Sequence, residues 1–590
     1  MPEKDKGWTP SKCLEAVLEG QRFQRNFGNA DFWSVYNGYY RGTFGDLDYF
    51  YNLYFIFIRS IMPTIYYKDP HLNVVPMKTF GPDPDPVRQV GALVLQSIDN
   101  ILLKKMGVKQ TIRDIAYDTL CTSRGIAKVG YASEFGPQQA TPEPTGKEPR
   151  TEFSQHIKNK MPWVSRCAPQ QFIVPYGTRR MHSAPWVCHI PLRYTEDVRN
   201  SKYYKNVKDL SGSHINLLQK WLDQYNLETW SDYSEFTEIH EFLDQRKGEL
   251  MAYIPDWGGE PRLEEKWVRE PSRDNLMVKM LEGEIPYEDL CFNDDPDFFY
   301  GPSDFRQLEP LQIEVNETME QARQHRQISL LKFLIQKGLI EPGELAKFMD
   351  AEHPGIGIEV NGNPATAVFQ LQSHIPPDFP AWEDNNREKA REITGVGKQQ
   401  AGIMQGGRKT AREVMTAQAG FDTRVGEKRD AIAEFVQRVM GKVNKVIANA
   451  WTVADVVPVV GVDGALYWVE FNQEVLKGDF STRIDADELS PTSLQQRRAD
   501  ILQMAQTIGG AGLPVDFLLR KLLSLYDDLD IQSILPPGNN GQVMPAGRFQ
   551  AEQVQMSPEQ RMMGAGGAFE RLTNASPRAG ATPQMGFGPE

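Results

Sequence analysis

Hydrophobic and polar positions follow a clear helical pattern between residues 382 and 451. Over the second half of this stretch, apolar residues recur on one face: Val425, Ile432, Phe435, Val436, Val439, Val443, Val446, Ile447 and Ala450. Thr410 followed by Glu413 forms a capping box, which predicts a long helix over 410–452. Gly420 lies within it, and Asp422 or Thr423 is placed to re-cap the chain. This arrangement favours one kinked helix over two separate helices.

Two other helical stretches lack an apolar stripe. Residues 382–393 and the middle of 311–334 are polar on all sides. Such helices lie in solvent or pack through ion pairs and hydrogen bonds against other polar helices. Glu388 and Arg391 are three apart and can pair, whereas Asp384 and Glu388 are four apart and repel. We expect polar helices at 303–334 and 378–394, with a compact insert of a short helix and strands at 335–377.

The rest of the chain predicts an α+β fold that is mainly helical. The apolar run 47–58 is too short to span a bilayer and predicts a buried helix, followed by a strand at 64–67. We expect the remaining regular elements as helices at 87–106, from 112, within 195–226, 492–508 and 515–525, and strands at 126–131, within 163–192 and 236–280, at 465–471 and at 480–484. Residues 1–45 predict a loosely structured arm that packs on neighbours. Residues 536–590, rich in Gly, Pro, Gln, Met and Ala, predict a flexible tail.

Composition excludes several classes of protein. The chain of 590 residues has a formal net charge of −13, which argues against a general nucleic-acid coat. Its five cysteines are widely spread without a CxxC pair, so neither a disulfide scaffold nor a zinc site is expected and a reducing cytosol is the simplest setting. The first residues lack the apolar run of a signal peptide.

The glycine-rich stretch 395–409 is the main candidate for chemistry. Gly402 and Gly407 followed by Arg408-Lys409-Thr410 come within one residue of the phosphate-loop pattern, but the stretch follows a polar helix and not a buried strand. It is either a flexible surface hairpin or a mobile loop that carries Lys398, Arg408 and Lys409 toward a polyanion.

Two further motifs are weaker. His240-Glu241 lacks a second histidine at helical spacing, which predicts a core or surface histidine rather than zinc. Asp294, Asp295 and Asp297 lack the glycine and glutamate of a calcium loop and predict a solvated turn. No catalytic arrangement stands out, so we expect neither an enzyme nor a cofactor.

The order of these elements resembles the portal (head-to-tail connector) proteins of tailed bacteriophages. A polar helix, an insert, a second polar helix, a glycine-rich loop from Ile393-Thr-Gly-Val396 and a long helix opened by Lys409-Thr-Ala411 follow one another as in that family. Three local runs resemble it as well, at 59–65, 124–131 and 299–303. The resemblance extends over most of 40–535 and rests on the ordered set, because no single motif is diagnostic.

The resemblance implies a division of the chain into named parts. These are an N-terminal arm (1–45), a wing (46–302 and 453–489), a stem (303–334 and 378–394), a clip (335–377), a tunnel loop (395–409), the long kinked helix (410–452), a helical crown (490–535) and the flexible tail (536–590). The DNA-facing residues of the tunnel loop would be Lys398, Gln399, Gln400, Arg408 and Lys409. The stem and ring contacts would be Glu317, Glu320, Arg323, Arg326, Arg387, Glu388 and Arg391, with no metal site.

The resemblance also implies partners and a place. It implies a homo-oligomeric ring, typically of about twelve subunits, which closes through head-to-tail interfaces. The ring would lie at a capsid vertex of the virion, be made in the host cytoplasm, and let double-stranded DNA pass without sequence recognition. Its partners would be the packaging motor (terminase large subunit), tail adaptor proteins, the major capsid protein and scaffold or internal core proteins. Acidic channel walls would repel phosphates.

Chain length and the lack of a long crown helix favour a short-tailed phage. Two alternatives stay open. A nucleotide-dependent motor subunit would need a true phosphate loop followed by an acid at the end of a strand. Another virion structural protein or scaffold would have no DNA channel.

Overall fold

The computed structural model describes helices, strands and turns over most of the chain. The described residues are 7–28, 30–42, 50–77, 86–135, 157–201, 204–208, 210, 236–255, 267–272, 279–328, 332–335, 337–338, 340–349, 359–361, 363, 368–371, 378–394, 411–450, 455–460, 466–471, 476, 478, 480–484, 489, 503, 543–545 and 548. Helix predominates over strand, as the expected α+β fold requires. Two compact units result: a sheet unit (Met1–Val35, Ile58–Ser303 and Ala411–Glu590) and a helix-pair unit (Tyr36–Phe57 and Asp304–Thr410).

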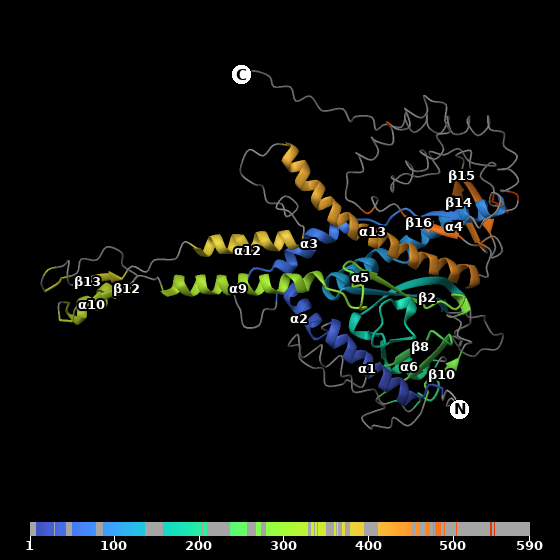
Figure 1. Cartoon of the computed structure of the whole chain (residues 1–590), viewed down its shortest axis with the longest axis horizontal. Coiled ribbons are helices and arrows are strands. Elements are labelled where there is room, and N and C mark those ends of the chain that lie inside the picture. The colour runs from blue at the N-terminus through green and yellow to red at the C-terminus, as the bar shows by residue number, and fades with distance from the viewer. Residues whose placement is uncertain are drawn as a thin grey trace, which may run out of the picture. The chain divides into compact units, whose positions relative to one another are not determined.

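A five-stranded antiparallel sheet forms one layer of the sheet unit (Figure 1). Its order is β10 (Arg269–Ser272), β9 (Glu249–Tyr253), β8 (His240–Asp244), β5 (Trp186–His189) and β4 (Phe172–Ile173). The turns and short elements near it are η1 (Pro169–Gln171), η2 (Met181–Ser183), α6 (Thr195–Asn200) and the paired strands β6 (Leu192–Tyr194) and β7 (Phe236–Glu238).

The prediction that 1–45 forms a loosely structured arm is wrong. Residues Pro10–Gly28 form helix α1 and Ala30–Arg41 form α2. Cys13 and Val17, one turn apart on α1, are fully buried in one cluster with Trp186, Phe242 and other residues of the five-stranded sheet. The apolar face of α1 is narrow and is interrupted by polar residues, so its helical pattern is weak. The prediction for 1–45 followed the scattered aromatic residues of 32–40 instead.

A second antiparallel sheet has the order β11 (Tyr287–Cys291), β2 (Arg124–Phe135) and β3 (Ile157–Cys167). Helices α4 (Pro86–Lys105) and α5 (Val108–Thr122) precede β2 in the chain, close to their expected bounds. Burial of the apolar faces of α4 and α5, with Val94, Leu95, Ile98, Ile112 and Ile115 inside, fixes them in the core.

Helix α13 (Ala411–Ala450) confirms the long helix expected from the hydrophobic pattern. It runs through Gly420 without interruption. All nine residues of the predicted apolar stripe are buried, including Ile432, Phe435 and Val443 at 0% exposure. The helix packs against β11, β2 and β16 (Phe480–Arg483) through this face.

The strand expected at 64–67 is wrong. Helix α3 (Leu53–Ile65) continues through Pro63, because Ile61, Met62 and Ile65 are buried together at helical spacing. The strand of this region is β1 (Asn73–Pro76), and it pairs with β16. The strand expected at 480–484 thus forms, as β16, a two-stranded ribbon with β1.

Three strands form another small sheet, in the order β14 (Asp455–Val460), β15 (Leu466–Phe471) and β17 (Val543–Pro545). The tail expected to be flexible throughout 536–590 thus contributes a strand that pairs in parallel with β15. The short Val-Met-Pro run supplies this pairing. Apart from Gln503, Val543–Pro545 and Arg548, the predicted crown and tail lie outside the described residues.

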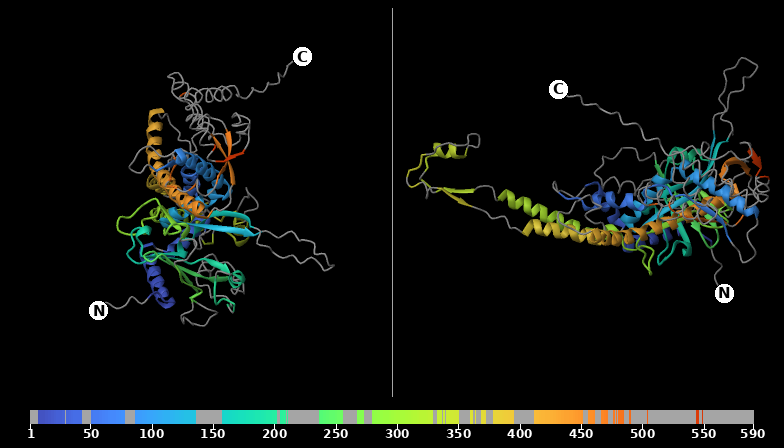
Figure 2. Two further views of the ribbon diagram at one scale, coloured as in Figure 1. Left: turned by 90° about the vertical axis from the view of Figure 1, so that its right-hand side faces the viewer. Right: turned by 90° about the horizontal axis from the view of Figure 1, so that it is seen from above.

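The helix-pair unit contains α9 (Asp304–Ile328) and α12 (Asp378–Thr394), which lie side by side (Figure 1 and Figure 2). Between them in the chain come β12 (Lys332–Ile335), α10 (Pro342–Met349) and β13 (Val368–Leu371), and β12 pairs with β13. The expected helix 303–334 therefore ends earlier, at Ile328. The run Lys-Phe-Leu-Ile at 332–335 suits a strand better than a polar helix, and it pairs with β13.

Candidate functional site

Two buried amides on α9 organise the helix-pair unit. Gln312 and Asn316 lie one helical turn apart and are 1% and 4% exposed. The side chain of Gln312 accepts a hydrogen bond from the Leu53 backbone N–H at 2.8 Å and donates to the Tyr51 carbonyl at 2.7 Å and to Asn316 Oδ1 at 3.0 Å. These bonds satisfy backbone groups that the start of α3 would otherwise leave without partners. The amides therefore fix the segment before α3 onto α9.

Tyr51 extends this contact to α12. The guanidinium carbon of Arg387 lies 4.1 Å from the centre of the Tyr51 ring, in cation–π geometry. Trp382 Nε1 donates directly to Glu314 Oε1 at 2.8 Å, which joins α12 to α9. A cation–π contact contributes about 0.5–2 kcal/mol, depending on how far water is excluded. Tyr51 and Trp382 thus link the two polar helices.

An aromatic cluster closes the other end of α9. The rings of Tyr54 and Phe305 are 4.6 Å apart, and Tyr36 is 6.1 Å from Phe305. All three are fully buried, and Tyr36 Oη donates to Glu309 at 3.0 Å. Edge-to-face aromatic pairs add about 0.5–1.5 kcal/mol beyond their buried area. The start of α9 is therefore held by apolar packing, while its middle is held by amides.

The residues predicted for stem and ring contacts lie on these helices, and the structure pairs some of them. Glu320 and Arg323 are 3.7 Å apart, and Glu388 and Arg391 are 3.3 Å apart. Arg387 pairs with Glu383 and lies 3.8 Å from Asp384. Each of these ion pairs joins residues of one helix, where such a pair contributes about 0.3–0.5 kcal/mol. They stiffen α9 and α12 but do not hold one to the other.

The charged side chains of the two helices also reach solvent in this subunit. Glu317, Arg326 and Glu388 are exposed. The predicted tunnel-loop residues lie outside the described residues: Lys398, Gln399, Gln400, Arg408 and Lys409. The phosphate-loop-like stretch 402–410 lies outside them as well.

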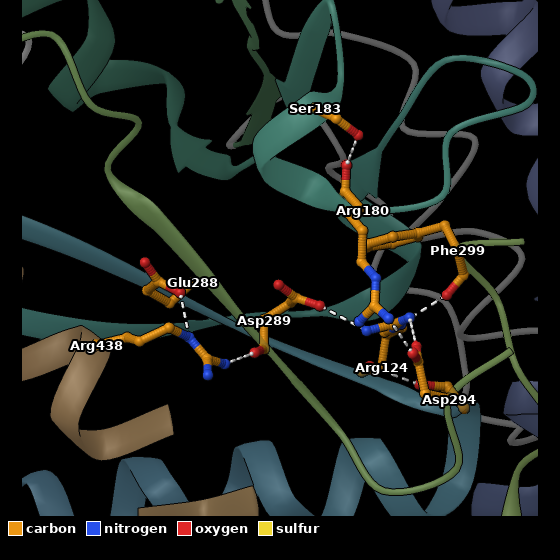
Figure 3. A network of polar contacts seen from close by, with 9 residues as sticks. Arg124, Arg180, Ser183, Glu288, Asp289, Asp294, Phe299 and Arg438 are labelled. Carbon is orange, nitrogen blue, oxygen red and sulfur yellow. Dashed lines mark hydrogen bonds and ion pairs between the residues drawn. The ribbon is translucent and has the colours of Figure 1, made fainter. Parts of the chain in front are cut away.

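A buried arginine in the sheet unit anchors the segment that precedes α9 in the chain (Figure 3). Arg124, at the start of β2, is 3% exposed and lies 2.7 Å from both Asp289 and Asp294. Its Nε donates to the Phe299 carbonyl at 2.6 Å, and its guanidinium stacks 4.7 Å from the Phe299 ring. Arg180 pairs with Asp294 at 2.7 Å. The acidic turn was expected to be solvated, but its Asp294 is bound by two arginines.

Helix α13 covers the outer edge of β11, the end strand of its sheet. Arg438 donates to Glu288 at 2.9 Å and to the Asp289 carbonyl at 2.7 Å, as Figure 3 shows. Lys442 donates to the Tyr287 carbonyl at 2.6 Å. Carbonyl groups without partners at the edge of a sheet can pair with another chain. Here Arg438 and Lys442 bond to the carbonyls of Asp289 and Tyr287.

His240-Glu241 lies in the core, as one of the two expected environments requires. Burial lowers the pKa of His240 to about 3, and its Nδ1 lies 3.1 Å from the Tyr253 hydroxyl. Burial would raise the pKa of Glu241, but Lys128, at 2.5 Å, and His189 outweigh it and hold the pKa well below its ordinary value. Within the described residues, no group of His, Cys, Asp and Glu is arranged to hold a metal ion. No helix among them is long and apolar enough to cross a membrane.

Sequence reasoning missed Gln312, Asn316, Tyr51 and Arg124. A signal for the first two was present: amides spaced i, i+4 on the one side of α9 that also carries Leu308 and Val315. Arg124 gave no signal, because its three partners lie 165 to 175 residues away in the sequence.

Two polar helices joined by a small strand-and-helix tip, followed in the chain by a long amphipathic helix, define a subunit of the phage portal class. The sequence model of the Phage SU10 portal protein family matches residues 112–513, and the chain belongs to this family. The matched region includes α9, the tip elements, α12 and α13. A comparison with curated protein sequences gives no match.

Proposed function

We propose that this portal protein assembles into a closed ring at one capsid vertex and that double-stranded DNA passes through its centre during packaging and ejection. The observation that carries the proposal is the family match, which covers both polar helices, the segment between them and α13. In this proposal α9 and α12 form the stem, and the tip with β12, α10 and β13 forms the clip. The stretch 395–409 forms the tunnel loop.

The charge pattern of α9 and α12 supports a ring. The ion pairs Glu320–Arg323 and Glu388–Arg391 each lie within one helix, and Glu317, Arg326 and Glu388 are exposed. Around a closed ring of about twelve copies, each exposed charge meets a different surface of the next subunit, because head-to-tail interfaces are heterologous. Charges of both signs on one polar helix pair can then be matched between neighbours.

The net charge of −13 supports passage of DNA without tight binding. Acidic walls repel phosphates, while the basic loop residues Lys398, Arg408 and Lys409 make weak, sequence-independent contacts. The ring itself performs no catalysis in this proposal. The terminase large subunit supplies the work of packaging at the clip, tail adaptor proteins replace it afterwards, and the major capsid protein surrounds the ring.

The test of this channel is neutralisation of the loop. We expect K398Q/R408Q/K409Q to form normal rings but to package or retain less DNA in a phage that depends on this gene. The matched control removes the same charge from exposed residues at the end of α4 and the start of α5, K104Q/K105Q/K109Q, and should package normally. Equal packaging by both triple variants would contradict a DNA-facing role for the loop.

A virion structural or scaffold protein without a channel is the second candidate. It shares the virion setting but predicts assemblies without a central hole. Negative-stain electron microscopy of the purified protein separates the two candidates, because it shows whether the assemblies have a central hole.

A further inference from the structure

A hydrogen-bonded pair joins α4 to α13 deep in the sheet unit. Asp99 of α4 is 0% exposed. Asn444 of α13 donates from Nδ2 to Asp99 Oδ2 at 3.0 Å, and the same amide nitrogen lies 3.4 Å from Thr482 Oγ1 on β16. The pair therefore sits where α4, α13 and β16 meet.

Two oxygen atoms of this pair lack a hydrogen-bond partner among the described residues. They are Asp99 Oδ1, the second oxygen of the carboxyl group, and Asn444 Oδ1, the oxygen of the amide. If the carboxylate is ionised, both atoms are acceptors and cannot bond to each other. A buried acceptor without a donor costs about 1–3 kcal/mol, and a buried unpaired charge costs more. One proton removes both defects, because a carboxylic acid and a primary amide form two antiparallel hydrogen bonds.

Among the described residues, no charged side chain of the surrounding elements bonds to Asp99 or Asn444. Strand β1, which packs on α4, has no titratable residue. On α13, Arg438, Lys442 and Lys445 pair with Glu288 and Glu284 at the β11 side. On α5, Asp118 pairs with Arg166 and Asp114 accepts from Gln110, while Lys109 of α5 and Arg483 of β16 are exposed. The side chain of Asp455 on β14 lies outside the described residues.

We propose that Asp99 is protonated in the folded protein, that its O–H donates to Asn444 Oδ1, and that this neutral acid–amide pair is a proton-dependent lock holding α13 against α4. The lock stands independently of the proposed channel. Loss of the proton breaks one of its two bonds and leaves a charge between the helices. In the chain, α13 directly follows the stretch predicted to be the tunnel loop, so the lock acts on the helix that carries that stretch.

The titration of the buried carboxyl supports the lock. Burial raises the pKa of Asp99 to about 8 from its ordinary 3.8, against the lowering effect of the bond from Asn444. Because the folded pKa lies above the unfolded one, stability from this group is fully present below about pH 4 and is lost progressively as the pH rises to about 8. The lock is thus mainly closed at neutral pH and open in alkali.

Asp99→Asn tests the lock, because its amide can donate to Asn444 Oδ1 at every pH. We expect hydrogen–deuterium exchange of the full-length protein, corrected for intrinsic rates, to accelerate between about pH 7 and pH 9 in peptides covering 94–103 and 440–449 of the wild type. In Asp99→Asn this acceleration should be absent, and the thermal midpoint at alkaline pH should rise by several degrees. At pH 7, where Asp118 with its pKa of about 6 is mostly ionised, the infrared band of a protonated carboxyl should be present in the wild type and lost in the variant.

Asp118→Asn is the matched control, because Asp118 is equally buried but bonds to Arg166 Nε at 2.5 Å. Burial raises the pKa of Asp118 to about 6, against the opposing effect of Arg166. Asp118→Asn should leave the alkaline acceleration of exchange in 94–103 and 440–449 as in the wild type, because Asp118 bonds to Arg166 and not to Asn444. Three results would overturn the lock: exchange in the two peptides that does not change with pH, a less stable Asp99→Asn protein at alkaline pH, or no protonated-carboxyl band assignable to Asp99. Even if a variant does not fold, the wild-type infrared titration remains decisive, because a band lost near pH 8 belongs to Asp99 and one lost near pH 6 to Asp118.

Discussion

Arg124 is a single buried side chain that binds three residues of one distant segment, 289–299. Replacing it by alanine leaves Asp289 without its cation and the Phe299 carbonyl without its donor, while Asp294 keeps only Arg180. Breaking a buried pair from one side costs about 3–5 kcal/mol, and we expect a loss of stability of that order for Arg124→Ala. Thermal or denaturant unfolding of the purified protein measures it.

Arg180 provides the control at the same carboxylate. Its side chain is 56% exposed and it also pairs with Asp294 at 2.7 Å. Arg180→Ala should cost only about 0–1 kcal/mol, because solvent screens an exposed pair. Similar losses for the two variants would show that Arg124 does not organise the network.

At the scale of elements, two glycines in helices should respond in opposite ways to alanine. A Cβ at Gly20 on α1 would lie 2.5 Å from Ile173 Cγ2 and 2.7 Å from the Val174 carbonyl oxygen. Gly20→Ala should therefore push α1 off the sheet and cost about 1–3 kcal/mol. Gly441 on α13 has open space around it, and Gly441→Ala should stabilise the helix by about 0.5–1 kcal/mol. Thermal midpoints that shift in the same direction would contradict this packing of α1.

The link between α9 and α12 gives a second prediction at this scale. Arg387→Ala removes the contact with Tyr51 together with the pairs to Glu383 and Asp384, and it should weaken the protection of α12 against proteolysis or hydrogen exchange, at a cost of about 1 kcal/mol. Arg391→Ala removes only a pair with Glu388 on its own helix and should cost about 0.3–0.5 kcal/mol. An equal effect would mean that Tyr51 does not join the helices.

The sequence predicted elements with a strong period and missed those that depend on distant partners. The stripe of α13 was predictable because nine apolar residues repeat over seven turns, and all nine are buried. The end of α9 was not, because the strand at 332–335 is decided by its partner at 368–371. Strand β17 was missed for the same reason, since a three-residue run pairs only because β15 offers an edge.

The candidate site was predictable in part. The i, i+3 pair of Glu388 and Arg391 follows from spacing alone, and the structure contains it. The amides Gln312 and Asn316 bond to the backbone of 51–53, some 260 residues earlier in the chain, which helical spacing does not encode. Asp99 and Asn444 are separated by 345 residues and were equally invisible.

For the whole molecule, the account depends on assembly. The ion pairs within α9 and α12 contribute only a few tenths of a kcal/mol each, so the exposed charges of these helices add little to the stability of one subunit. In the proposed ring, neighbouring copies would add contacts to the exposed charges of the two helices. Charge reversal at exposed positions of the pair, such as Glu317→Lys with Arg326→Glu, should therefore impair assembly more than it changes the stability of the subunit. Light scattering and thermal unfolding of the same preparation separate the two effects.

The most direct measurement of the central claim is negative-stain electron microscopy of the purified full-length protein, with mass determined by light scattering. The account predicts closed rings with a central hole and a mass that is a multiple of the 67.0 kDa subunit. A protein that stays monomeric at every concentration and salt tested would contradict the portal ring.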